Sequence, residues 1–150
     1  MKIISTVAEI RISYHPKSDL TKTPRIRESR DLYQIFRNSW DPDLIQYVEQ
    51  FKVLLLTRAN HVLGLVNIST GGTTATVADP RVIFGTALKA NATGIALCHN
   101  HPSGCLKPSR EDIKLTRKIV EGARLFDISV VDHLIISPMT YMSMLDEGLL

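Results

Sequence analysis

Short apolar runs along the chain predict the strands of one sheet. Residues 51–57 and 62–69 are two such runs, separated by the polar stretch 58–61, and this pattern is typical of a β-hairpin. A wholly apolar run at 94–98 is what a central strand buried on both faces requires. Residues 128–137 are interpreted as another buried strand, and 2–14 alternate loosely enough to form one more.

Helices are expected between these strands, each opened by a capping residue or by a proline in its first turn. The expected starts are Ser29, Asp41-Pro42, Asp79-Pro80 and Ser109. Residues at helical spacing follow three of them: Leu32, Ile35 and Phe36; Val82, Ile83, Ala87 and Ala90; and Ile113, Thr116, Val120 and Ala123. A last short helix is expected over 141–145, and the proline-containing stretch 15–26 is expected to be a loop.

This alternation of helices and strands around one mixed sheet predicts the class α/β, or α+β by a stricter definition. A length of 150 residues suggests one domain, 1–150, large enough to bury a core without help from a disulfide or a metal. We expect residues 1–45 to be an N-terminal extension that packs on the domain or leads into it.

Composition changes this picture little. Apolar residues make up 44% and charged residues 22%, as in ordinary globular proteins. No apolar run reaches the roughly 18 residues of a membrane span, and the first residues do not resemble a signal peptide. We therefore expect a cytoplasmic protein that is not in a membrane and whose two cysteines, Cys98 and Cys105, are reduced.

The distribution of charge offers one candidate binding segment. Residues 11–30 hold six lysines and arginines against two acids, within a formal net charge of +3. Such a segment can contact the phosphates of DNA. We favour the simpler interpretation, a solvated loop or arm, and a stacking platform for single strands is not indicated.

The stretch 98–112 carries the candidate chemistry. His99 and His101 are two residues apart at the exit of a predicted strand, so their side chains point to the same side and can share a metal. Asp112, in the first turn of the next helix, can supply a third ligand, which leaves one position for water. Each residue also has a simpler interpretation: an isolated His-x-His pair is weak evidence, and Ser109 with Asp112 resembles a helix capping box.

The spacing as a whole resembles a known family. His99-x-His101, seven residues, Ser109, two residues and Asp112 match the motif of the JAMM (JAB/MPN) metalloproteases at every spaced position. The flanking residues 99–104, 79–81 and 132–135 look more narrowly like the RadC-like branch of that superfamily. The resemblance covers roughly 28–150 and implies a JAB/MPN-like (cytidine deaminase-like) fold. Since the chain has 150 residues, we do not expect it to contain the helix–hairpin–helix region of longer RadC-like proteins.

The resemblance also implies roles. It assigns Zn²⁺ to His99, His101 and Asp112, water activation to Glu49, and an oxyanion hydrogen bond to Ser109. The implied activity is hydrolysis of an amide, peptide or isopeptide bond in an unknown peptide or protein. Without the resemblance, Glu49 reads as an ordinary surface acid. Two alternatives remain: a DNA repair-associated protein that binds or acts on nucleic acid, and a non-catalytic interaction module.

Four other residues lie close to this constellation. Cys98 should face away from His99 into the core, as a small apolar residue. Cys105 lies in the loop after the histidines and is a weak candidate for an additional ligand. Asp132 and His133 can support a metal ligand through a hydrogen bond, or equally satisfy each other or the backbone.

Overall fold

A five-stranded sheet with the strand order β2-β1-β3-β4-β5 forms the centre of the protein. The computed structural model describes residues 7, 8, 10, 11, 13, 15–72 and 77–150. The strands are β1 (Gln50–Leu56), β2 (Val62–Thr70), β3 (Gly94–Asn100), β4 (Ser129–Ile136) and β5 (Tyr141–Ser143). Neighbouring strands are antiparallel except β3 and β4, which are parallel.

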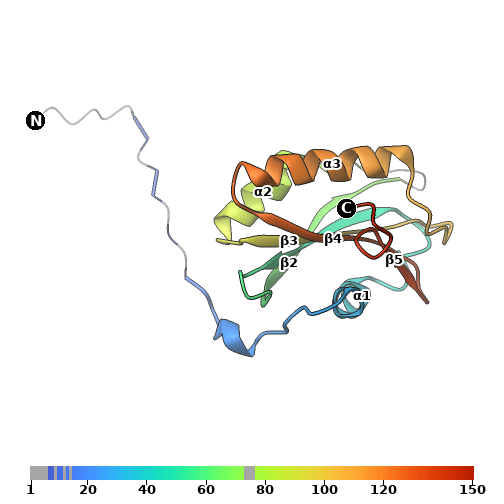
Figure 1. Cartoon of the computed structure of the whole chain (residues 1–150), viewed down its shortest axis with the longest axis horizontal. Helices are drawn as coiled ribbons and strands as arrows, with labels where there is room; N and C mark the ends of the chain where they lie inside the picture. The colour runs from blue at the N-terminus through green and yellow to red at the C-terminus, as the bar shows by residue number, and fades with distance from the viewer. Residues whose placement is uncertain (1–6, 9, 12, 14, 73–76) are drawn as a thin grey trace, which may run out of the picture.

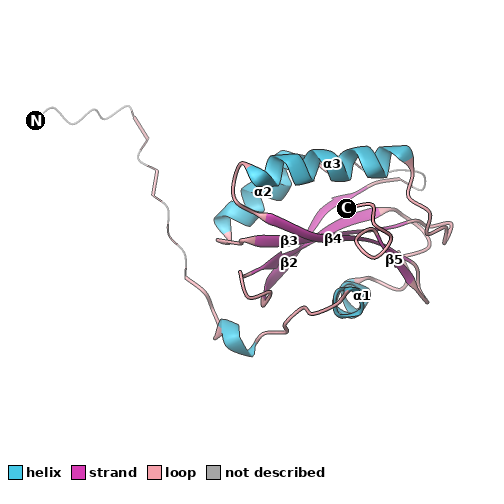
Figure 2. Ribbon diagram, in the orientation of Figure 1, coloured by secondary structure: helices cyan, strands magenta, loops and turns pink. Residues whose placement is uncertain are grey.

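Helices cover both faces of this sheet. The helices are α1 (Ser29–Ser39), α2 (Pro80–Lys89) and α3 (Arg110–Arg124), and a 3-10 helix, η1 (Leu20–Lys22), precedes them. Helices α2 and α3 lie on one face and α1 lies on the other (Figures 1 and 2). Mixed strand directions with helices on both faces confirm the predicted fold class. Among the described residues, no helix is both long and apolar enough to cross a membrane.

Strand β3 lies in the middle of the sheet and contributes to two cores. Ile95 and Leu97 pack with residues of α2 and α3, whereas Ala96 and Cys98 pack with residues of α1. All seven residues of β3 are buried, which confirms the buried strand predicted over 94–98. Cys98 therefore faces the α1 side, and the α2 and α3 side is left for His99.

The hairpin and two helix starts are confirmed. Strands β1 and β2 pair antiparallel around the turn at 58–61. Asp79 caps α2, because its side chain accepts a hydrogen bond from the backbone N–H of Arg81. Pro80 occupies the first turn of the helix. Ser109 caps α3. These helices begin where predicted because the sequence around each start contains the whole capping signal.

Several expectations were wrong. Glu28, not Ser29, caps α1, since the Ser29 hydroxyl donates instead to the carboxylate of Asp146. Residues 42–47 form successive turns, not a helix. Residues 141–143 form β5, because they pair with the otherwise free edge of β4 at 134–136. The strand expected over 2–14 lies partly outside the described residues, and those described there have no strand pairing.

Candidate metal centre

The exit of β3 places two imidazole rings on the α3 side of the sheet. The ring of His99 stacks on that of Phe51 in β1, with centroids 6.0 Å apart. His101 follows two residues later, and the two Nε2 atoms lie 3.0 Å apart. His99 is 1% exposed and His101 is half-buried, so one ring closes the inner side of the site and the other faces its opening.

A tight loop brings the chain back to the site. The backbone N–H of Gly104 donates to the carbonyl of His101 at 2.8 Å, and Gly104 has a φ of 79°, which suits glycine. At the start of α3, Ser109 and Asp112 form a reciprocal capping box. The Ser109 N–H donates to Oδ2 of Asp112 at 2.7 Å, and the Asp112 N–H donates to Oγ of Ser109 at 3.0 Å.

The three candidate ligands converge. Oδ1 of Asp112 lies 3.2 Å from Nε2 of His99, and Oδ2 lies 3.3 Å from Nε2 of His101. A tetrahedral zinc ion with ligands at about 2.0 Å places neighbouring ligand atoms about 3.3 Å apart. The spacing of these atoms therefore fits a metal ion. Among the described residues, they form the one group of three or more His, Cys, Asp and Glu side chains close enough to hold one.

Each histidine has a hydrogen-bond partner behind its metal-facing nitrogen. Nδ1 of His101 donates to the carbonyl of Cys105 at 2.6 Å, since that carbonyl can only accept. Nδ1 of His99 lies 2.8 Å from Nε2 of His133 in β4. Such partners orient a ligating ring and fix which nitrogen is free. Cys105 thus contributes its carbonyl, and its exposed thiol is not part of the ligand group.

Asp132 and His133 point to different parts of the molecule. The ring of His133 contacts His99 and Thr116. The carboxylate of Asp132 accepts hydrogen bonds from the hydroxyl of Ser143 and from the backbone N–H groups of Leu145 and His133. Asp132 therefore fastens the C-terminal residues to β4, and only His133 reaches a candidate ligand.

The electrostatics of the site reflect these contacts. Burial alone opposes ionisation of Asp112, but hydrogen bonds from His101 and the Ser109 N–H, together with the electrostatic effect of the nearby His99, hold the pKa of its carboxyl well below the usual range. The hydrogen bond with Asp112 raises the pKa of His101 despite its partial burial. Burial, with His99 nearby, holds the pKa of His133 well below its usual range.

Glu49 lies near enough to His101 for its charge to act there. It precedes β1, where Phe51 is paired with His99, so Glu49 lies on the same side of the sheet as both histidines. It is half-buried, and its charge contributes to the raised pKa of His101. Backbone hydrogen bonds hold it in place, because its carbonyl accepts from Gly71 and its N–H donates to Gly72.

The sequence analysis missed Asn100, which supports the segment before β1. Its Nδ2 donates to the carbonyls of Ile45 and Val48 at 2.7 and 2.9 Å, and its Oδ1 accepts from the N–H of Gln50 at 2.8 Å. Asn100 is wholly buried. A polar side chain at the end of a buried strand, between two candidate ligands, was the available signal.

Two kinds of sequence comparison relate this chain to known proteins. A family model described as the RadC-like JAB domain matches residues 26–149. A UPF0758 protein of Flavobacterium johnsoniae is 37% identical over 150 residues, which cover 99% of this chain and 64% of that protein. One of Porphyromonas gingivalis is 36% identical over 151 residues (99% and 65%), and one of Symbiobacterium thermophilum is 43% identical over 103 residues (69% and 44%). The chain thus spans less than two thirds of the length of these relatives.

Proposed function

The chain belongs to the RadC-like JAB domain family, and on that basis we propose that it is a zinc-dependent hydrolase of an amide, peptide or isopeptide bond. One observation carries the proposal: Nε2 of His99, Nε2 of His101 and the carboxylate of Asp112 converge, with each imidazole nitrogen 3.2 to 3.3 Å from one carboxylate oxygen and the two nitrogens 3.0 Å apart. Two imidazoles and one carboxylate suit zinc, and three protein ligands leave a fourth position open, as in catalytic zinc sites.

The mechanism divides the work between the ion and the protein. Zinc at this site would supply a Lewis acid that polarises a carbonyl and lowers the pKa of water to about 7. Glu49, on the same side of the sheet as the histidines, would hold the proton removed from the attacking water and later deliver it to the leaving amine. Its effect on the pKa of His101 supports this proximity.

Ser109 can stabilise the oxyanion of the substrate while it caps α3. Its hydroxyl oxygen accepts the hydrogen bond from the Asp112 N–H, which uses a lone pair and not the hydroxyl proton. The proton remains available for donation to a developing negative charge on the scissile carbonyl oxygen. The two roles that the sequence suggested for Ser109 are therefore compatible.

Two measurements test the proposal. Protein purified without chelators should contain about one zinc per chain, and Asp112→Ala should abolish that content. The wild-type protein should cleave members of a peptide and isopeptide panel, and Glu49→Gln should lower the rate about 100-fold or more. Glu111→Gln, an exposed glutamate beside the site, is the matched control and should retain full activity. Full activity of Glu49→Gln would remove Glu49 from the mechanism, and a wild-type protein that binds no zinc would reject the function.

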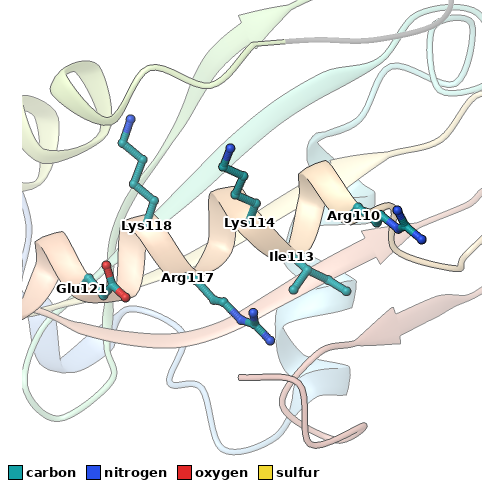
Figure 3. Close-up of a pocket in the computed structure, with 6 residues that line it drawn as sticks. All are labelled: Arg110, Ile113, Lys114, Arg117, Lys118 and Glu121. Carbon is teal, nitrogen blue, oxygen red and sulfur yellow. The ribbon is translucent and has the colours of Figure 1, made fainter.

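A second candidate function, contact with nucleic acid, is favoured by one surface. The exposed face of α3 carries the side chains shown in Figure 3, which line a surface pocket: Arg110, Ile113, Lys114, Arg117, Lys118 and Glu121. Four of the six are basic and one is acidic. Such a surface can follow a phosphate backbone, and Asp112, one of the candidate ligands, lies in the first turn of α3.

Binding to duplex DNA at several salt concentrations tests this second function. We expect the affinity to fall steeply as salt rises, and K114E/K118E to weaken binding at least about tenfold. The control R81E/K89E changes the net charge equally on α2 and should bind like the wild type. Equal loss in both variants, or no binding by the wild type, would reject α3 as a nucleic-acid surface.

A further inference from the structure

A chain of three short contacts runs behind His99 into the interior. Nδ1 of His99 lies 2.8 Å from Nε2 of His133, and Nδ1 of His133 lies 2.6 Å from Oγ1 of Thr116. Oγ1 of Thr116 in turn lies 2.6 Å from the backbone carbonyl oxygen of Asp112. The three side chains are at most 2% exposed. This row of contacts therefore links β3, β4 and α3 in the interior, away from solvent.

The direction of these hydrogen bonds follows from the last contact. A carbonyl oxygen only accepts, so the single hydroxyl proton of Thr116 must point at Asp112. The reverse arrangement would leave two oxygen atoms 2.6 Å apart with no hydrogen between them. The sulfur of Met144, at 3.6 Å from Oγ1, is a weaker and more distant acceptor. Because the hydroxyl proton of Thr116 is donated to Asp112, Oγ1 of Thr116 accepts a hydrogen bond from Nδ1 of His133, and this nitrogen therefore carries a proton.

The protonated Nδ1 of His133 also determines the hydrogen bond between His133 and His99. The neutral ring of His133 has one N–H, at Nδ1, so its Nε2 is a lone pair that accepts from Nδ1 of His99. A neutral His99 that is protonated at Nδ1 has its own lone pair at Nε2. That atom faces Nε2 of His101 and Oδ1 of Asp112. The lone pair of His99 thus points to the place where a metal ion fits.

We propose that Thr116 and His133 are positioning residues that hold His99 in the one tautomer able to bind a metal through Nε2. The proposal rests on the metal site of the proposed function, but not on the reaction. It assigns a purpose to a buried threonine in the middle of α3 and to a histidine whose ring has no polar side-chain partner among the described residues except His99 and Thr116. A single hydrogen bond from Nδ1 to the carbonyl of Cys105 holds His101 in the same tautomer.

The first test is spectroscopic and needs no metal. In the full chain freed of zinc, the imidazole ¹⁵N resonances of His99 should show a protonated Nδ1 and an unprotonated Nε2. His133 should show the same pattern. A His99 ring protonated at Nε2 in the wild-type protein would overturn the proposal, whatever the protein does with zinc or with peptides.

The second test is zinc affinity, measured by competition with a chromophoric chelator. Thr116→Val keeps the shape of the side chain and removes the hydroxyl, and Thr116→Ser keeps the hydroxyl. We expect Thr116→Val to weaken zinc binding about 10- to 100-fold and Thr116→Ser to bind like the wild type. Equal affinity of Thr116→Val and Thr116→Ser would overturn the proposal.

The two tests separate this proposal from the proposed function. A wild-type protein that binds no zinc rejects the zinc hydrolase, and the ¹⁵N spectra still decide the tautomer of His99. If Thr116→Val does not fold, as judged by its thermal unfolding curve, the spectra of the wild-type protein decide alone. If the role of Thr116 were purely structural, Thr116→Val would lower the stability of the protein without changing its affinity for zinc.

Discussion

Asp112 serves two purposes with two oxygen atoms. Oδ2 accepts the capping hydrogen bond of Ser109 and faces His101, whereas Oδ1 faces His99. The sequence presented the helix cap and the metal ligand as alternatives for this residue. They coincide because an ionised carboxylate has about four lone pairs, enough for a cap and a metal together. The cap orients the carboxylate before any metal arrives.

Asn100 offers a test of how the segment before β1 is held. Asn100→Asp should lower the free energy of unfolding by about 3 kcal/mol or more, because a buried carboxylate would face two backbone carbonyls that now accept hydrogen bonds. Denaturant titration of the metal-free protein measures this change. Asn67→Asp is the control, since Asn67 lies exposed on β2, and it should change stability by less than about 0.5 kcal/mol. Equal stability of the two variants would contradict the role of Asn100.

The pKa of His101 predicts how a metal competes with protons. The hydrogen bond with Asp112 raises this pKa above its ordinary value of 6.5, so the proton is held to a higher pH than on a free histidine. A metal must displace that proton, and its apparent affinity should fall as the pH drops from 8 to 6, by up to about tenfold per pH unit. Chelator competition at several pH values measures the trend. An affinity that is constant over this range would contradict it.

At the scale of elements, local sequence signals were enough to predict where α2 and α3 begin. They were not enough to predict the cap of α1 or the formation of β5. Asp79-Pro80 and Ser109 carry their capping partners within three residues. Ser29 looks like an equally good cap, but its hydroxyl contacts Asp146 and Tyr141, which are more than a hundred positions away. Residues 141–143 become a strand only because the edge of β4 is free to pair. Neither partner can be identified from a short window of sequence.

Gly85 and Gly122 both lie within helices, and replacing each by alanine compares an open position with a crowded one. A Cβ on Gly85 of α2 meets nothing within 4 Å, so Gly85→Ala should raise the free energy of unfolding by about 1 kcal/mol through helix propensity. A Cβ on Gly122 of α3 would lie 2.9 Å from the ring of Phe84, which packs against Phe126. We therefore expect Gly122→Ala to give no net gain in thermal or denaturant unfolding. Equal gains would show that Phe84 moves aside freely.

Over the whole molecule, the sequence predicted the three candidate ligands but not the interior that supports them. His99, His101 and Asp112 were predicted from their spacing together with the resemblance to the JAMM motif. His133 becomes a neighbour of His99 only when β4 lies parallel to β3, with Leu97 opposite His133. Thr116 joins them only when α3 packs across both strands. Its helical spacing indicated a buried position, but not which polar atom it would meet.

The two cysteines report on the integrity of the whole fold. Cys98 is wholly buried between the sheet and α1, and burial raises the pKa of its thiol well above its usual range. A raised pKa leaves little reactive thiolate at pH 8, whereas Cys105 is exposed. The native Cys105→Ala protein should therefore react negligibly with a thiol reagent, and should release one equivalent on unfolding. Rapid reaction of this native variant would contradict the packing of the α1-side core.

The position of Asp112 at the start of α3, opposite the two histidines, has a further consequence for the loop 102–108. Coordination by His99 and His101 on one side and Asp112 on the other would act as a cross-link that closes a short loop between strand and helix. Because a metal ion binds the folded site and leaves on unfolding, its binding free energy adds to the stability of the closed loop. It would also hinder the local opening that a protease needs to cut a loop. Resistance of residues 102–108 to a nonspecific protease would then report occupancy of the site without any knowledge of the substrate.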